Sequence, residues 1–191
     1  SMVLYLFFWP VPVDPVIWEP PHSPALEGDY TPNNYLVNVE RFGLGDGIGP
    51  EDVDVDAFGN IYTGYEEGEI IRYKPDGSGG ERFAHTGGRP LGLEFDKYGN
   101  LIVADALQGL LSIDPLGKIT VLTTGTNDVK FGFADDLDIS PDGTIYFSDA
   151  SSKTGITDYR HDIVDHRPYG GLFAYEPQSK RTYQVQDSMY F

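Results

Sequence analysis

The chain has 191 residues, the size of a single domain and enough to bury a hydrophobic core. Its formal net charge of −17 makes contact with nucleic acid phosphates or an anionic lipid surface unfavourable, so we expect no nucleic-acid partner. It contains no cysteine, which excludes disulfides and thiolate metal sites, and its 23 Gly, 14 Pro and 13 Tyr are typical of a β-rich protein.

The N-terminal segment, residues 1–34, differs in composition from the rest of the chain. Its apolar start, VLYLFFWPVPV (residues 3–13), is interrupted by prolines well before the ~20 residues that a membrane-spanning helix needs, and it lacks the features of a signal peptide. Residues 14–34 contain five prolines and are predicted to be extended. We therefore expect an N-terminal arm, and two interpretations of its start remain open. It is the outer end of a membrane anchor, or it is a strand or hydrophobic arm that docks on the body or on a partner.

One sequence unit occurs three times in the remaining chain. Each copy combines a short alternating strand, a tight turn that ends in Gly, and a second strand. The copies are VDVDAFGNIYTG (residues 53–64), LEFDKYGNLIVAD (93–105) and LDISPDGTIYFSD (137–149). A third strand follows in GEIIRYKP (68–75), GLLSIDP (109–115) and GLFAYEP (171–177). A fourth follows in ERFAHT (81–86), ITVLTT (119–124) and RTYQVQ (181–186).

Four antiparallel strands in each unit of ~40 residues are typical of a β-propeller blade. The sequence therefore predicts an all-β domain over residues 35–191, with three four-stranded antiparallel blades near residues 49–88, 89–130 and 131–191. A lone strand, YLVNVERF (35–42), is expected before the first blade. Three blades are half of a six-bladed propeller, and an open half ring exposes apolar blade faces. We therefore expect a homodimer that completes the ring.

The third unit carries an insertion, residues 150–170, between its second and third strands. It is predicted to be a loop with a short helix near residues 158–165, at one end of the propeller, where such insertions often line ligand sites. Histidine titrates near neutral pH, so His161 and His166 are candidate residues of a pocket at this rim. The alternative is a surface loop whose histidines have no such role.

Acidic residues occupy the first strand of each unit at fixed distances before its glycine. Asp54, Glu94 and Asp138 stand five residues before Gly59, Gly99 and Gly143 in all three units. A residue type that recurs in every blade indicates a role in the blade itself. We therefore expect these three carboxylates to bind loop backbone or a neighbouring blade through hydrogen bonds.

Glu51 and Asp135 stand eight residues before the glycine in the first and third units, where the second unit has Leu91. In a propeller these positions lie at one rim of the central channel, so carboxylates from two blades converge there. Hard oxygen ligands suit Ca²⁺ or Mg²⁺, and unpaired buried carboxylates are otherwise costly. Arg89, at the same rim in the middle blade, offers an acid–arginine network as the alternative. Both interpretations remain open.

Three long stretches resemble the strictosidine synthase-like branch of the six-bladed propellers: GPEDVDVDAFGNIYTG, GRPLGLEFDKYGNLIVADALQGLLSI and FADDLDISPDGTIYFSDASS. This branch includes the adipocyte plasma membrane-associated protein type and is related to the SMP-30/gluconolactonase and paraoxonase groups. The resemblance covers residues 35–191 and only the N-terminal half of such proteins. WPVPVDPVIWEPP is similar to the stretch just after the membrane anchor of bacterial members. The resemblance favours a periplasmic, extracytoplasmic or membrane-associated location, with membrane contact of the arm.

The resemblance also implies site residues. In metal-dependent relatives, the positions of Glu51 and Asp135 help to hold a catalytic Ca²⁺, and those of Asp52 and Asp136 serve a deeper structural Ca²⁺. These four are therefore the candidate metal ligands, although relatives usually have Asn in place of Asp135. In the metal-free strictosidine synthases, the channel binds organic substrates, and a Glu from a later blade performs the acid–base chemistry.

Two functions follow from the resemblance. The first is a strictosidine synthase-like module that binds a small molecule or assembles into a ring, with catalysis lost or dependent on dimerisation. The second is a calcium-dependent esterase- or lactonase-like hydrolase with its site in the channel. No organic cofactor is expected, because the glycine-rich stretch GDGIGP (45–50) precedes a strand rather than the helix of a phosphate-binding loop.

Overall fold

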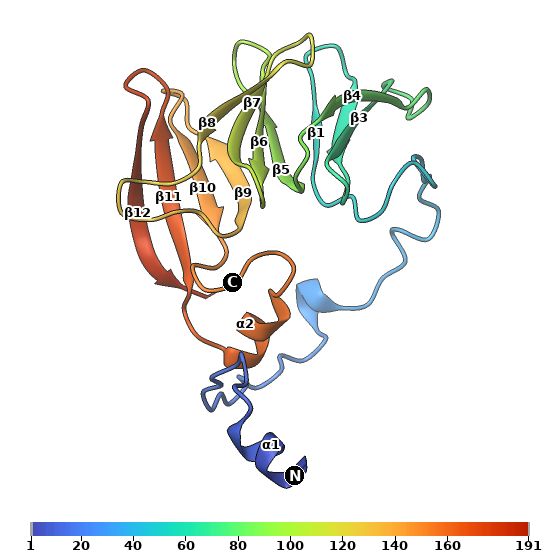
Figure 1. Cartoon of the computed structure of the whole chain (residues 1–191). Helices are drawn as coiled ribbons and strands as arrows, with labels where there is room; N and C mark the ends of the chain where they lie inside the picture. The colour runs from blue at the N-terminus through green and yellow to red at the C-terminus, as the bar shows by residue number, and fades with distance from the viewer. Residues whose placement is uncertain (1, 191) are drawn as a thin grey trace.

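The computed structural model describes residues 2–190 and contains three four-stranded antiparallel sheets. Blade 1 consists of β1 (Val53–Val55), β2 (Ile61–Gly64), β3 (Glu69–Tyr73) and β4 (Glu81–His85). Blade 2 consists of β5 (Pro90–Phe95), β6 (Leu101–Asp105), β7 (Gly109–Ile113) and β8 (Ile119–Thr123). Blade 3 consists of β9 (Ala134–Ile139), β10 (Ile145–Asp149), β11 (Gly170–Glu176) and β12 (Arg181–Met189). The strands of each sheet lie in chain order, which confirms the predicted all-β fold of three blades. Figure 1 shows the blades side by side.

The tight turns between the first and second strands form as the sequence predicts. Gly59 and Gly99 have φ angles of +86° and +83°, a backbone conformation that L side chains rarely adopt. The Asp56 carboxylate accepts hydrogen bonds from the N–H groups of Phe58 and Asn60, both at 2.9 Å. These local bonds fix each turn and therefore the register of the two strands it joins.

Two apolar cores lie between the blades rather than within one sheet. The first joins Tyr62 and Ile70 of blade 1 to Val103 of blade 2. The second joins Leu110 of blade 2 to Phe147 of blade 3. Each fully buried side chain of this size stabilises the fold by about 1.5–3 kcal/mol. Face-to-face packing of neighbouring blades therefore holds the arc together.

The insertion in blade 3 contains α2 (Arg160–Asp165), which confirms the short helix predicted there. The helix ends at His166, which adopts the left-handed conformation with φ of 49°. The insertion follows β10 at the end of the sheet where β9 begins, since the N–H of Ala150 donates to the carbonyl of Phe133 at 2.8 Å. In Figure 1, α2 lies at this end of the blades. The insertion therefore lies at the end where the inner strands start.

The N-terminal segment has little regular structure. It contains α1 (Met2–Phe8) and a single 3₁₀ turn (Gly28–Tyr30). The lone strand expected at residues 35–42 is wrong, because this stretch forms turns and irregular chain and pairs with none of the strands within residues 2–190. Of the helices that residues 2–190 form, none combines the length and apolar character that crossing a membrane requires.

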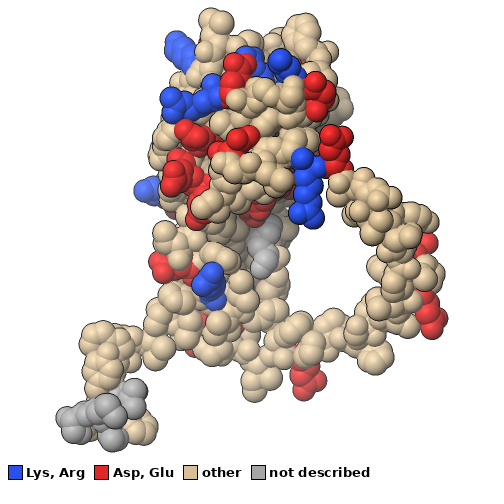
Figure 2. All heavy atoms as spheres, turned by 90° about the vertical axis from the view of Figure 1, so that its right-hand side faces the viewer, with Lys and Arg blue, Asp and Glu red and all other residues tan. Residues whose placement is uncertain are grey.

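The arm docks on the insertion of blade 3 at residues 14–18. The N–H of Val16 donates to the carbonyl of Asp165 at 3.0 Å, and the Asp165 carboxylate accepts from the N–H of Asp14. Arg167 forms an ion pair with Asp14 at 2.8 Å, and the rings of Trp18 and His166 lie 4.8 Å apart. Residues 30–41 are exposed, and Figure 2 shows the arm standing away from the body. Docking on the body therefore holds for residues 14–18, while the role of residues 3–13 stays a prediction.

Candidate functional site

The starts of the three inner strands surround one hollow of about 260 Å³. Glu51 and Asp52 lie just before β1, and Asp135 and Asp136 lie in β9. The middle blade contributes Leu91 and Gly92, which bring no charge. The structure therefore brings together the four acids that the sequence singled out, from two blades that are separated by a third.

Gly92 allows this close approach. A Cβ atom at this position would lie 2.9 Å from the Cα atom of Asp136 and 3.0 Å from the carbonyl oxygen of Asp135. These separations are shorter than ordinary contacts between carbon atoms. The missing side chain of Gly92 therefore lets the inner strands of blades 2 and 3 come together at the hollow.

Burial and mutual repulsion raise the pKa values of two acids in the hollow. Burial, with the negative charges of Glu51, Asp136 and Asp149, raises the pKa of Asp135 to about 6. Burial also raises the pKa of Glu51, against the opposing effect of Arg89. Asp135 makes no side-chain hydrogen bond to any residue within 2–190. The hollow therefore carries more negative charge than its own groups compensate.

Arg89 lies near the hollow but does not neutralise it directly. Its Nη2 donates to the carbonyl of Gly49 at 2.8 Å, and within the described residues it forms no ion pair with a carboxylate. Its Nη1 is buried and has no hydrogen-bond partner in this part of the chain. An orphaned buried donor is costly, and Arg89 itself does not line the hollow. The predicted acid–arginine network is present only as a longer-range attraction between Arg89 and Glu51.

The acids do not form a preformed metal cage. Across residues 2–190, no three His, Asp or Glu side chains are grouped so that they could hold a metal ion. Asp52 uses one carboxylate oxygen for the N–H of Val53 and the other for the N–H of Leu93, both at 2.7 Å. Asp136 uses one oxygen for the N–H of Leu137 at 2.9 Å. Glu51, Asp135 and the second oxygen of Asp136 therefore remain as donors for a cation, and they fit only part of the six or more oxygens that Ca²⁺ takes.

The two candidate histidines do not line this hollow. His166 packs between the rings of Trp18 and Tyr190, with centroids 4.8 Å and 5.2 Å away. His161 lies in the first turn of α2. The structure therefore places both in the insertion that holds the arm, and their role at the rim stays a prediction.

Sequence reasoning missed two buried acids that position the rim. The carboxylate of Asp105 accepts three hydrogen bonds at 2.9 Å, from the N–H groups of Arg89, Leu107 and Gln108. Asp149 does the same for blade 3, where it accepts from the N–H of Phe133 at 2.6 Å. The signal was available, because both acids end the second strand of their repeat, in LIVAD and IYFSD. They fix the loops that lead into the inner strands.

The family models and the related sequences agree with the fold. The model described as "Strictosidine synthase-like, N-terminal" matches residues 28–73, and the one described as "Strictosidine synthase" matches residues 135–191, together more than half of the chain. Strictosidine synthase-like protein 4 of Arabidopsis thaliana is 35% identical over 95% of this chain and 50% of its own length. The chain belongs to the strictosidine synthase-like family.

Other similarities fit this family and define the extent of the match. The adipocyte plasma membrane-associated protein of Salmo salar is 29% identical over 100% of this strictosidine synthase-like chain and 50% of its own length. The solved gluconolactonase from Xanthomonas campestris matches with a TM-score of 0.55 at 15% identity, over 69% of this chain and 44% of that one. The latter supports the propeller fold alone. The strictosidine synthase-like chain spans about half the length of the curated relatives it matches.

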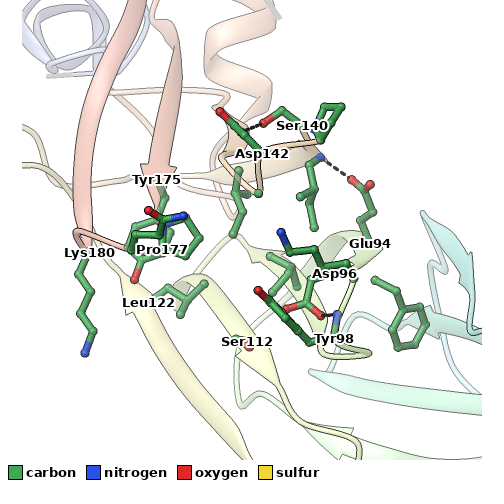
Figure 3. Close-up of a pocket in the computed structure, with 18 residues that line it drawn as sticks. Glu94, Asp96, Tyr98, Ser112, Leu122, Ser140, Asp142, Tyr175, Pro177 and Lys180 are labelled. Atoms are coloured by element: carbon green, nitrogen blue, oxygen red, sulfur yellow. Dashed lines mark hydrogen bonds between the residues drawn. The ribbon is translucent and has the colours of Figure 1, made fainter.

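A second, larger hollow of about 570 Å³ lies between blades 2 and 3 of the strictosidine synthase-like chain, at the opposite end of the inner strands (Figure 3). Its apolar lining includes Ile102, Leu122 and Tyr175. At its edge, Glu94 accepts a hydrogen bond from the N–H of Ile139 at 2.8 Å. Nothing in the repeat pattern predicts this hollow, since it depends on how two blades diverge at their turns.

Proposed function

We propose that this chain is a ligand-binding propeller module of the strictosidine synthase-like family, and that its acidic hollow binds a divalent cation, with Ca²⁺ as the candidate. The observation that carries this proposal is the convergence of the Glu51 and Asp135 carboxylates, from blades 1 and 3, without an ion-pair partner among the described residues. A cation would offset the burial and the repulsion that together raise the pKa of both groups.

The three blades supply only part of a coordination shell. Ca²⁺ takes six to eight oxygens in a flexible arrangement, so water, a small-molecule ligand or further blades must complete the shell. We propose that a small organic ligand with a carbonyl or carboxylate oxygen contributes to this shell.

The family and the arm support a location at a membrane or outside the cytoplasm. One relative is named as a plasma membrane-associated protein. In this chain, Phe7, Phe8 and Ile17 of the arm have exposed fractions of 79–97%. Exposed apolar residues of this kind suit contact with lipid or with an apolar partner surface. We propose that the start of the arm makes this contact.

The alternative is an esterase- or lactonase-like hydrolase that uses the same hollow. A specific observation supports it: a carboxyl group with a pKa near 6 suits general base chemistry close to neutral pH. Asp135 is the residue that would accept the proton. Glu51 would help to hold a Ca²⁺ that supplies charge stabilisation to a polarised carbonyl, and the pKa of Asp135 would fall below 6 while that cation is bound. This alternative requires hydrolytic activity, whereas the proposed binding function does not.

Calcium titration by calorimetry, at pH 7.5 in chelator-treated buffer, tests the proposal. We expect the wild-type chain to bind Ca²⁺ and the Glu51→Gln/Asp135→Asn variant to bind at least tenfold more weakly, because both charged donors are gone. Asp128→Asn is the matched control, since Asp128 is exposed and outside the hollow. A wild-type chain that gives no binding heat and no calcium-dependent change in melting would overturn the proposal. Calcium-dependent turnover of aryl esters that Asp135→Asn abolishes would favour the hydrolase instead.

A further inference from the structure

The two junctions between neighbouring blades use equivalent positions of the repeat. Tyr62 in blade 1 and Ile102 in blade 2 each stand three residues after the glycine of their turn. Both pair with the third strand in the same register, since Tyr62 lies opposite Arg72 and Ile102 lies opposite Ser112. The junction between blades 1 and 2 therefore shows how this chain fills the same space elsewhere.

Aromatic side chains fill the junction between blades 1 and 2. The ring of Tyr62 meets those of Phe83 and Phe95 edge to face, with centroids 5.1 Å and 4.9 Å away. The Arg72 guanidinium lies 5.9 Å from the centre of the Phe83 ring. The Tyr62 hydroxyl donates to the Asp56 carboxylate at 3.1 Å. Side chains of the protein therefore occupy this junction and satisfy one another.

Smaller side chains stand at the same four positions between blades 2 and 3. The replacements are Ile102 for Tyr62, Ser112 for Arg72, Leu122 for Phe83 and Ile139 for Phe95. All four smaller residues line the larger hollow of about 570 Å³ described above, and Figure 3 shows Ser112 and Leu122 among the residues around it. Blades 2 and 3 diverge at this end, and the absent rings leave the space between them unfilled.

Two complete four-stranded blades bound the larger hollow. Its walls belong to the faces of blades 2 and 3 that pack on each other, where Ile102 and Ile145 are part of one apolar core. All of its lining residues lie between positions 94 and 180, away from both ends of the chain. Its volume lies within the ~300–1,000 Å³ of small-molecule sites. The size and enclosure of the larger hollow therefore suit a small organic molecule.

The apolar lining of the larger hollow includes one buried polar side chain without a partner. Tyr175 stands where blade 2 has Ile113, since each lies opposite the first residue of the second strand. It is 3% exposed, and its hydroxyl makes no hydrogen bond within residues 2–190; burial alone raises its pKa. The hydroxyl of a buried tyrosine generally has a hydrogen-bond partner. Tyr175 therefore offers a donor for an acceptor oxygen of a ligand.

The charged residues around the larger hollow favour an uncharged ligand. Lys97 and Lys180 line it, and neither forms an ion pair within residues 2–190. Glu94, Asp96 and Asp142 line it as well, and each accepts a hydrogen bond from a backbone N–H group of the blades. Because both signs of charge are present, the lining gives no clear preference to an anion or a cation.

We propose that the larger hollow binds a small, uncharged and largely apolar molecule that carries a carbonyl oxygen. The apolar body of this ligand takes the space that Tyr62, Phe83 and Phe95 fill at the other junction, and the Tyr175 hydroxyl donates to its oxygen. The site lies at the opposite end of the inner strands from the acidic hollow, and it needs no cation. Its test is therefore independent of the calcium proposal.

Fluorescence titration with prodan tests this inference. Prodan is an uncharged naphthalene with one ketone oxygen, and its emission moves to shorter wavelength when it leaves water. The protein is titrated into dilute prodan in chelator-treated buffer, so that no bound cation takes part. We expect the wild type to give a saturating shift of the emission.

The variant Ile102→Tyr/Leu122→Phe refills the larger hollow with the residues of the other junction. It should bind prodan at least about tenfold more weakly, because its rings occupy the place of the ligand. The hydroxyl that Ile102→Tyr adds has an acceptor in Asp96, which stands where Asp56 accepts from Tyr62. The variant should therefore melt no lower than the wild type. Val121→Phe is the matched control, since it adds a ring to the same strand outside the lining of the larger hollow and should bind prodan as the wild type does.

The variant Tyr175→Phe removes the hydroxyl alone. Binding should weaken by about fivefold, the effect of one hydrogen bond. The emission of bound prodan should move further to shorter wavelength, because the ketone loses its donor, and a change in packing alone would not produce that shift.

Three results would overturn the inference. The first is a wild type that leaves the prodan spectrum unchanged. The second is an Ile102→Tyr/Leu122→Phe variant that melts like the wild type and binds prodan equally well. The third, which decides the question if the refilled variant does not fold, is a Tyr175→Phe variant with the affinity and emission of the wild type.

Discussion

Replacing Asp135 by Asn should stabilise the protein at neutral pH. The carboxyl group of Asp135 lies in the acidic hollow, where burial and the charges of Glu51, Asp136 and Asp149 raise its pKa to about 6 from an ordinary 3.8. A raised pKa means that the folded state holds the proton more tightly than the unfolded state does. The charged form therefore destabilises the fold above pH 6, and this penalty disappears as the pH falls through 6 towards 3.8.

The size of the effect follows from the two pKa values. The interval between 3.8 and about 6 corresponds to about 3 kcal/mol, since each pH unit is equivalent to about 1.4 kcal/mol. Solvent reaches part of the carboxyl group and screens its repulsion, so we expect about 1–2 kcal/mol. For a chain of this length, that gain raises the melting temperature by about 2–6 °C.

The assay is thermal unfolding of wild type and Asp135→Asn from pH 4 to pH 8, in chelator so that no cation relieves the repulsion. The gain should be full above pH 6 and small near pH 4, where the wild-type carboxyl is protonated. Asp128→Asn, at an exposed position, should show no such pH dependence. An equal gain at pH 4 and pH 8, or a loss at pH 8, would refute the electrostatic argument. Added calcium should then stabilise the wild type more than the variant.

Three further predictions concern bonds outside the hollow. Asp105→Ala should cost about 1–3 kcal/mol in urea unfolding, because three partly buried N–H groups lose the buried carboxylate that accepts from them; a cost under about 0.5 kcal/mol would contradict this role. Glu94→Ala should cost about 1–3 kcal/mol and speed hydrogen exchange at the N–H of Ile139, and unchanged exchange there would argue against the inter-blade bond. Asp165→Ala should release the arm and make residues 14–34 more sensitive to limited proteolysis, with blade cleavage unchanged; an equally resistant arm would show that other contacts hold it.

The blades could be predicted from the repeats because the residues that form each strand and turn lie close together in the sequence. Alternating strands, Asp at the start of a turn and glycine at the left-handed position act within a dozen residues. The recurrence of acids at Asp54 and Glu94 predicted a hydrogen-bonding role, and the structure confirms it for both. The strand expected at residues 35–42 was wrong because composition alone does not decide whether a strand forms, and this stretch pairs with none of the strands within residues 2–190.

The sequence predicted which residues meet at the site, but not the hydrogen bonds that depend on how neighbouring blades are aligned. That Glu51 and Asp135 meet follows from the repeat, because equivalent positions lie at one rim. The repeat does not predict that backbone N–H groups occupy both oxygens of Asp52, because one of these bonds depends on how two blades are aligned.

The glycine at position 92 also has a consequence for the curvature of the arc. Six blades close a ring only if each turns by about 60° from the last, and that angle depends on how closely the inner edges approach. At Gly92, the inner edges of blades 2 and 3 are separated by less than a side chain would need. A methyl group there would wedge the inner edges apart and flatten the arc. A flatter arc would no longer fit the curvature of a six-bladed ring, so one small residue inside the arc sets how all three blades are oriented.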